Sequence, residues 1–301
     1  MYAHTLQDLP LSWKRTDLDE PVFKTIPIGT HHWLSLAEVP PDFKMDELDK
    51  NFPAQPSKKL LIRGCNRPVV RFLNKFGFRS FYIGQEAVLD LSQNPFEKKS
   101  LMALVKRGLK HGRIIEIPFN IENKHKIEQL KAESLYGSRP KLKHLFRTEF
   151  ESGMRGFIFE NIQHDWLAAI TLSPVHSKKK KTELLVKKEK TPVGIMEALI
   201  HHIHKTLQVE QIKYWSLGEV PFVNDGSKKS VKERFAGAIG RSLKAVYNYQ
   251  GLYLFKNKFN PDWQPVFLCA KSGNWIKILS QMFIKSNLLR LVVWKFGLLK
   301  N

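Results

Sequence analysis

Two lysines near the C-terminal end of the chain, Lys256 and Lys258, stand in the stretch that is densest in aromatic residues. This stretch, 247–268, reads YNYQGLYLFKNKFNPDWQPVFL. A lysine held beside an apolar surface can bind an anion or stabilise a developing negative charge. We therefore expect Lys256 and Lys258 to line an anion-binding cleft. The alternative is a segment that closes the core while its lysines point into solvent.

The local sequence predicts how these lysines are held. Gly251 permits a turn that a residue with a Cβ resists, and Leu252, Phe255 and Phe259 then share one face of a short helix. Pro261 ends that helix, and the apolar run 266–270 predicts a buried strand.

Strands and helices alternate through the rest of the chain, which predicts an α+β or α/β fold. Asn66 and Pro68 have the residue types that begin a helix. The run of lysines at 178–181 predicts an exposed hairpin loop. We expect strands at 59–64, 79–83, 87–91, 113–117, 155–161, 166–173, 182–186 and 212–217, and helices at 66–77, 99–111, 195–207 and 231–246.

The order strand 182–186, loop, helix 195–207, strand 212–217, helix is that of an N-acetyltransferase-like fold. In that fold two strands separate to receive an acyl donor, and a helix N-terminus faces phosphates. The loop here, KEKTPVGIM, contains the single glycine Gly194 and so differs from the glycine-rich loop of coenzyme A users. We therefore expect no coenzyme A and no other cofactor.

Other chemistries lack their usual residue patterns. His201 and His204 have helical spacing but no nearby third ligand, so a surface cluster is favoured over a metal site. Neither Cys65 nor Cys269 has an activating neighbour, and no G-x-S-x-G or P-loop motif occurs. We expect no metal.

A net charge of +21 favours polyanionic partners, either nucleic acid or acidic lipid. Two cysteines suit a reducing compartment, and the start of the chain has no apolar signal segment. No window approaches the roughly 18 apolar residues of a spanning helix. These features predict a cytoplasmic protein, free or peripheral on the inner face of the membrane.

The segment 273–301 is basic and amphipathic, and its sequence predicts an apolar side formed by Trp275, Ile276, Ile278, Leu279, Met282 and Phe283. One interpretation is a helix docked on the body of the protein. The other is an interfacial helix on anionic lipid.

Four spaced motifs resemble the soluble C-terminal catalytic domain of the lysyl-phosphatidylglycerol synthases, also called phosphatidylglycerol lysyltransferases. These are GFRSFYIGQEAVLDLS (77–92), SLMALVKRGLKHG (100–112), WSLGEVPF (215–222) and the stretch from Tyr247 to Pro265. The resemblance covers about residues 60–270. It implies a stand-alone, soluble form with tandem acetyltransferase-like (GNAT) lobes, mixed central sheets and flanking helices: a shortened first lobe, 1–125, a second lobe, 126–272, and the tail, 273–301.

The resemblance also implies an activity. Family members transfer an amino acid from aminoacyl-tRNA to a membrane lipid hydroxyl, in a tunnel between the lobes. It implies catalytic roles for Lys256, Lys258 and Glu183, with Glu183 placed to bind an amine. The substrate-binding residues that it implies are Tyr247, Asn248, Gly251, Lys187 and Gly218. The chain departs from the family pattern where Val186 replaces an arginine and Lys244 replaces an acidic residue.

Three hypotheses follow. The first is an aminoacyl or acyl transferase that acts on a membrane lipid such as phosphatidylglycerol. The second is a catalytically degenerate protein that binds RNA or acidic lipid. The third is a coenzyme A-dependent acyltransferase, which the loop at Gly194 disfavours.

Overall fold

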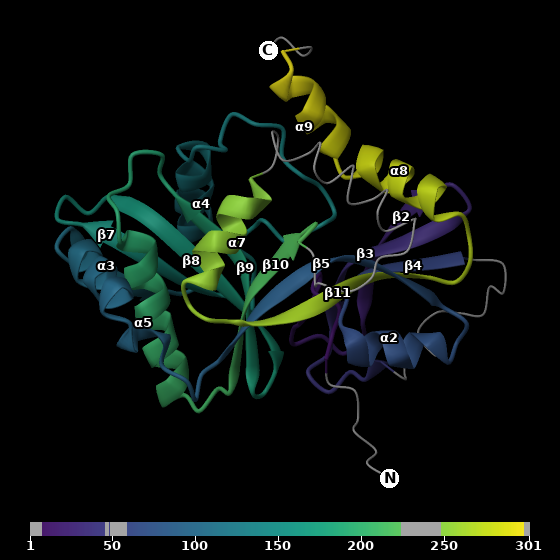
Figure 1. The fold of residues 1–301 in the computed structure, drawn as a ribbon, viewed down its shortest axis with the longest axis horizontal. Coiled ribbons are helices and arrows are strands. Elements are labelled where there is room, and N and C mark those ends of the chain that lie inside the picture. The colour runs from purple at the N-terminus through teal and green to yellow at the C-terminus, as the bar shows by residue number, and fades with distance from the viewer. Residues whose placement is uncertain (1–7, 46–47, 49–58, 224–247, 298–301) are drawn as a thin grey trace.

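One mixed sheet runs through the whole molecule in the computed structural model, which describes residues 8–45, 48, 59–223 and 248–297. Its strand order is β1-β3-β4-β11-β5-β10-β9-β8-β7-β6, with β2 paired to β3. Helices lie against both faces, so the fold is α+β (Figure 1). The predicted helix 231–246 lies outside the described residues.

The strands are β1 (Trp13–Arg15), β2 (Val22–Ile28), β3 (His31–Val39), β4 (Lys59–Cys65), β5 (Arg79–Asp90), β6 (Gly112–Ile117), β7 (Arg155–Asn161), β8 (Trp166–His176), β9 (Lys179–Lys187), β10 (Tyr214–Pro221) and β11 (Asp262–Ala270). The helices are α2 (Arg67–Asn74), α3 (Lys99–Leu109), α4 (Ile121–Ala132), α5 (Ile195–Val209), α7 (Tyr249–Asn257), α8 (Trp275–Lys285) and α9 (Leu288–Lys295), with a 3₁₀ turn, η2 (Pro95–Glu97). As predicted, Asn66 caps α2 by accepting a hydrogen bond from the Val69 amide.

Two expectations about strands were wrong. The segments 79–83 and 87–91 form one strand, β5, because β11 pairs with Arg79 to Val88 on one edge and β10 pairs with Gly84 to Asp90 on the other. Of the lysine run, Lys178 does lie exposed in the hairpin turn between β8 and β9, but strand β9 begins at Lys179, and Lys179 and Lys181 are buried. Their burial is tolerated because Lys179 pairs with Glu86 and Lys181 pairs with Glu183.

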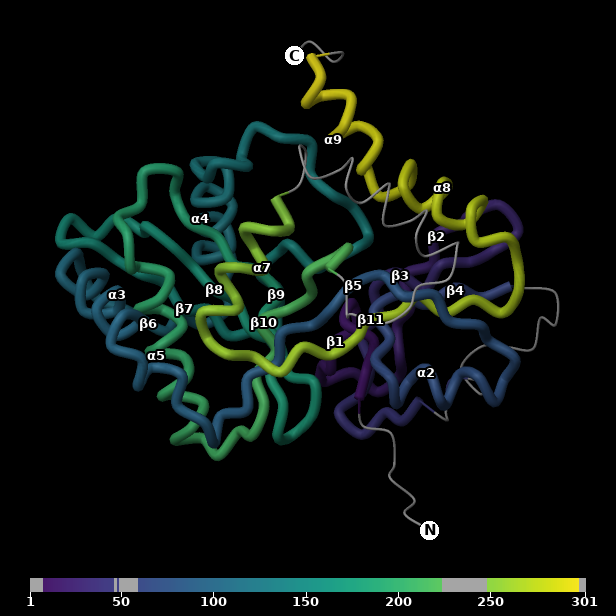
Figure 2. The backbone as a smooth tube through the Cα atoms, in the orientation of Figure 1, coloured from purple at the N-terminus to yellow at the C-terminus, as the bar shows by residue number. Residues whose placement is uncertain are grey.

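The largest apolar core lies between α3, α5 and the sheet. It joins residues of β5 and α3 to residues of β7, β8 and β10, together with Phe259 just after α7. Positions before and after residue 125 therefore share one core, and the division of the chain at that residue stays a prediction. A second core lies under α2, and β11 crosses between the two regions, as Figure 2 shows.

Helices α8 and α9 follow β11 along one edge of the molecule (Figure 1). Ile278 and Met282 of α8 are buried against the sheet, and Trp275 packs on Phe81 with ring centroids 5.3 Å apart. The docked-helix interpretation of this segment is thus confirmed for α8. Among the described residues, no helix has both the length and the apolar character needed to cross a bilayer.

Two glycines allow α3 to approach the first turn of α5. A Cβ on Gly108 of α3 would lie 2.3 Å from the carbonyl oxygen of Gly194. Gly194 itself has φ +98°, and a Cβ there would lie 2.2 Å from the carbonyl oxygen of Leu104. Both close contacts are with backbone atoms, which cannot rotate away.

We predict that Gly108→Ala destabilises the fold by about 1–3 kcal/mol, because the added methyl must force α3 away from α5. Denaturant unfolding followed by circular dichroism measures this. Lys106→Ala, at an exposed position of the same helix, is the control and should change stability by less than about 0.5 kcal/mol. Equal stability of Gly108→Ala and the wild type would contradict the packing described here.

Candidate functional site

Strands β9 and β10 part in the middle of the sheet. They pair in parallel from Tyr214 to Ser216, opposite Lys179–Lys181, and the ladder ends there. Strand β10 continues along β5 through a bulge between Ser216 and Glu219. Gly218, in this bulge, has φ +87°, which favours glycine. This separation of two parallel strands is the feature that the acetyltransferase-like order of elements predicts.

Lys256 reaches the parting from α7. Its Nζ lies 3.5 Å from the position that a Cβ of Gly218 would take, and the Thr182 carbonyl oxygen lies 3.8 Å from the same point. The ammonium donates a hydrogen bond to the Glu219 carbonyl oxygen at 3.1 Å. The residue is 4% exposed, so the alternative of a solvated lysine is wrong for Lys256.

The sequence around Lys256 explains its position. Asn248 caps α7 by accepting a hydrogen bond from the Gly251 amide at 2.9 Å. A Cβ on Gly251 would lie 2.5 Å from the Asn248 side chain, so glycine lets the cap close. Phe259, fully buried in the main core, fixes the other end of the segment. Tyr247 lies outside the described residues.

Burial lowers the pKa of Lys256 to about 7, while the nearby carboxylates of Glu219 and Glu86 oppose that shift. Near neutral pH the side chain is therefore divided between ammonium and free amine. Such a group can donate or accept a proton at little cost, which is a property of catalytic lysines.

Two buried carboxylates, Glu86 and Glu219, stand opposite each other on β5 and β10. The Arg63 guanidinium donates to Glu219 Oε1 at 2.7 Å. Lys179 Nζ lies 3.5 Å from Glu86 Oε1 without forming a hydrogen bond. Burial raises the pKa of Glu219, and Arg63 acts against that rise. Within the part of the chain that the structure describes, Glu86 Oε1 and Glu219 Oε2 have no hydrogen-bond donor, so each retains the capacity to accept one.

Glu183 has its own partners on the same strand as Thr182. Its carboxylate accepts hydrogen bonds from Ser173 Oγ at 2.5 Å, and Lys181 Nζ lies 2.9 Å away. Lys181 also donates to the carbonyl oxygens of Leu11 and Trp13, which ties β9 to the N-terminal segment. Burial lowers the pKa of Lys181. Glu183 thus comes directly after Thr182, whose carbonyl oxygen faces Gly218. Its side chain, however, is held by Ser173 and Lys181.

The remaining predicted residues lie apart from Lys256. Lys258 is partly exposed, with its Nζ 2.8 Å from Glu197 Oε1 in the first turn of α5 and 5.5 Å from the centre of the Phe255 ring. Lys187 is exposed at the end of β9. The structure therefore brings together Lys256 and Gly218 from the predicted set. The roles predicted for Lys258, Glu183, Lys187, Asn248 and Gly251 stay predictions.

Sequence reasoning missed Arg63, Glu86 and Glu219. A signal for the two acids was present, because Glu86 and Glu219 lie in otherwise apolar strand segments, within the motifs IGQEAV and WSLGEVPF. A charged residue in the middle of a buried strand is destabilising unless it is paired, and such a residue therefore indicates a candidate functional position.

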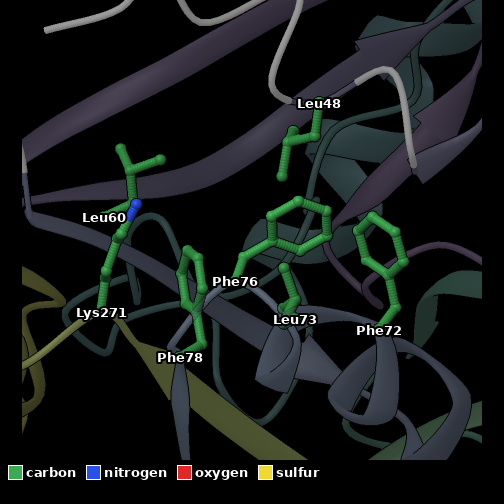
Figure 3. Close-up of a pocket in the computed structure, with 7 residues that line it drawn as sticks. All are labelled: Leu48, Leu60, Phe72, Leu73, Phe76, Phe78 and Lys271. Atoms are coloured by element: carbon green, nitrogen blue, oxygen red, sulfur yellow. The ribbon is translucent and has the colours of Figure 1, made fainter. Parts of the chain in front are cut away.

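The histidines of α5 were predicted to form a surface cluster, which is wrong for His204. This residue is fully buried, and its Nε2 contacts the Gln93 carbonyl oxygen at 3.2 Å. Within the described ranges no group of three metal-ligating side chains occurs. An apolar pocket beside α2 has a volume of about 20 Å³, room for a water molecule but not for a substrate (Figure 3). It is lined by Leu48, Leu60, Phe72, Leu73, Phe76, Phe78 and Lys271.

We predict that Lys256→Met changes the pH dependence of stability. The pKa of Lys256 is lower in the folded protein than its ordinary value of 10.5, so the unfolded chain binds more protons between about pH 7 and 10.5. Wild-type stability should therefore rise with pH in this window, relative to the variant. Urea unfolding of both proteins between pH 6 and pH 9.5 measures the difference, and a constant difference would contradict a buried lysine with a lowered pKa.

The sequence matches the family model described as "Phosphatidylglycerol lysyltransferase, C-terminal" over residues 50–270. The phosphatidylglycerol lysyltransferase of Bacillus subtilis (strain 168) is 22% identical over 246 residues, which are 78% of this chain and 28% of that protein. The chain thus spans little more than a quarter of that relative's length.

Two solved structures share the fold. L-PGS from Bacillus licheniformis superposes with a TM-score of 0.71 at 19% identity, covering 90% of this chain and 86% of that one. The C-terminal domain of a protein assigned as a lysylphosphatidylglycerol synthetase, from Agrobacterium fabrum, gives a TM-score of 0.68 at 17% identity, covering 89% and 85%. With a family match across most of its length and the fold of these domains, the chain belongs to the family of phosphatidylglycerol lysyltransferase C-terminal domains.

Proposed function

We propose that this protein transfers an aminoacyl group from aminoacyl-tRNA to a hydroxyl group of a membrane lipid such as phosphatidylglycerol. The observation that carries the proposal is Lys256, a buried lysine with a pKa of about 7 at the parting of β9 and β10. Membership of the lysyltransferase family supports the choice of donor and acceptor. The net charge of +21 suits both a tRNA and an anionic lipid surface.

The reaction needs charge stabilisation more than a protein nucleophile, because an aminoacyl ester is already activated. The lipid oxygen attacks the ester carbonyl carbon, and the carbonyl oxygen becomes an oxyanion. When that intermediate collapses, the bond to the tRNA ribose oxygen breaks, and the proton lost by the lipid hydroxyl ends on the ribose oxygen. A Lys256 ammonium at the parting would stabilise the oxyanion, and in a buried site this interaction is stronger than in water.

The free carboxylate oxygens suit the amine of the aminoacyl group. Glu86 Oε1 and Glu219 Oε2 are buried and have no hydrogen-bond donor among the described residues, so an ammonium placed between them would satisfy both. Arg63 holds Glu219 through the other oxygen of that carboxylate, Oε1, which fixes its orientation. Lys179 Nζ lies 3.5 Å from Glu86 Oε1, so an incoming ammonium would share this oxygen with Lys179. The negative charges of Glu219 and Glu86 both act on the pKa of Lys256, so binding of the amine and protonation of Lys256 would be coupled.

A binding protein without activity is the second candidate. The observation that favours it is Glu183, whose carboxylate is occupied by Lys181 and Ser173 instead of facing an open site. The coenzyme A hypothesis has less support, because the backbone of α3 packs directly on the first turn of α5, where a pyrophosphate would have to lie.

We predict that Lys256→Met lowers the transfer rate by at least about 100-fold, the usual effect of removing one oxyanion-stabilising group. The assay follows a labelled amino acid from aminoacyl-tRNA into lipid extracted from phosphatidylglycerol vesicles and separated by chromatography. Lys213→Met, the same change at an exposed site, is the matched control and should leave the rate unchanged. The assay compares the transfer rates from several different aminoacyl-tRNAs.

The pH profile tests the protonation state. If the ammonium is the active form, the wild-type rate should fall as pH rises through about 7, since Lys256 then loses its proton. Lys256→Arg keeps its charge and should lose this fall, even at a lower rate. A rate that Lys256→Met leaves intact would refute the catalytic role. No labelled lipid with any donor, combined with tight RNA or vesicle binding, would favour the second candidate.

A further inference from the structure

We propose that the outer side of α8 and α9 is a docking surface for an anionic lipid bilayer. We refer to this surface as the α8–α9 face. It consists of four exposed apolar side chains and four exposed cations: Ile276, Ile284, Leu289, Phe296, Lys277, Lys285, Arg290 and Lys295. The proposal rests on the proposed function only in supplying a lipid acceptor, because docking itself can be measured without any transfer.

The apolar members of the α8–α9 face are too exposed to serve the core. Ile276 and Ile284 are 55% and 56% exposed, Leu289 is 43% exposed and Phe296 is 64% exposed. The inner side of α8 already supplies Ile278 and Met282 to the core, and Leu291 of α9 is buried as well. These helices are therefore apolar on two sides, and the described residues cover only one of them. An uncovered apolar side flanked by cations is typical of helices that lie in the membrane interface.

The charge of this region has one sign. From Trp263 to Asn301 the sequence contains five lysines and one arginine, and no aspartate or glutamate. The one-sided charge is a local feature, since the chain as a whole has 28 acidic residues. Such a segment is attracted to the negative potential of an anionic leaflet, and each cation near the surface adds to the binding.

A second basic segment lies beside the helices. The Lys143 amide donates to the Ser286 carbonyl oxygen at 3.1 Å, and Asn287 Nδ2 donates to the Lys141 carbonyl oxygen at 3.0 Å. Both lysine side chains are exposed. Lys141 and Lys143 are thus joined to the turn between α8 and α9. These bonds also hold the helices in place, so the surface is already formed before any partner binds.

The residue types favour a bilayer over RNA. Transfer of isoleucine and leucine side chains from water to the acyl region of a bilayer is favourable, whereas contact with a phosphate backbone gives them no such stabilisation. Single-stranded RNA would instead call for exposed aromatic rings on which bases stack. On the α8–α9 face three of the four exposed apolar residues are aliphatic.

The test is co-sedimentation of the full chain with vesicles of phosphatidylcholine alone or with added phosphatidylglycerol. We expect binding to the anionic vesicles to be at least about 10-fold tighter, and to weaken as salt is raised. The double variant Ile284→Glu with Leu289→Glu should reduce this binding at least about 10-fold. The matched control, Ile162→Glu with Val209→Glu, adds the same charge at positions 79% and 85% exposed elsewhere and should bind as the wild type does.

Thermal unfolding shows whether each variant is folded, and a folded Ile284→Glu, Leu289→Glu protein that binds vesicles normally would overturn the proposal. Equal binding to both vesicle types would also overturn it. So would an equal loss of vesicle binding in the control variant, which would indicate a general charge effect. If the face variant lost RNA binding while its vesicle binding was unchanged, the surface would belong to nucleic acid.

A short-chain, dispersed phosphatidylglycerol separates docking from chemistry. We expect the face variant to use this acceptor at the wild-type rate and to lose transfer only to vesicles. Anionic vesicle binding with no transfer to either acceptor would reject the proposed function and leave the docking surface standing.

Discussion

The parting of β9 from β10 is the constraint on which the rest of the site depends. Once the ladder ends at Ser216, the backbone beyond it needs other partners, because unpaired buried polar groups are costly. Strand β10 stays paired with β5 on both sides of the bulge at Gly218, and the Lys256 ammonium donates a hydrogen bond to the Glu219 carbonyl oxygen. The amine that we assign to catalysis is therefore also a structural substitute for a missing strand. This double role explains why a lysine is buried there, although burial destabilises its charged form.

Much of the fold could be predicted from the sequence. The order of strands and helices, the Asn66 cap and the buried strand after Pro261 follow from local patterns, and local patterns are what a sequence displays. The burial of Lys179 and Lys181 could not be predicted, since a run of lysines normally lies in solvent. Their partner Glu86 is remote in sequence, and Glu183 looks like an ordinary charge at the surface of a strand.

Only those residues of the candidate site that stand in motifs of distinctive composition could be predicted. Lys256 and Gly218 belong to motifs whose composition sets them apart, and the structure brings them together. Arg63, Glu86 and Glu219 come from three strands far apart in the chain, and only the register of β4, β11, β5 and β10 makes them neighbours. That register depends on long-range pairing, for which no short pattern is a signal. Lys258 stands in the same motif as Lys256, but it lies two residues further along the chain and therefore on the exposed side, beside Glu197.

Strand β5 has a mechanical consequence. It is hydrogen-bonded to β11 on one edge and to β10 on the other, so both halves of the molecule are attached to a single continuous strand. Swinging one half away from the other would require breaking these ladders together, unlike the opening of two domains joined by a hinge. Chemistry at Lys256 would thus take place in a rigid frame, without separation of the two halves.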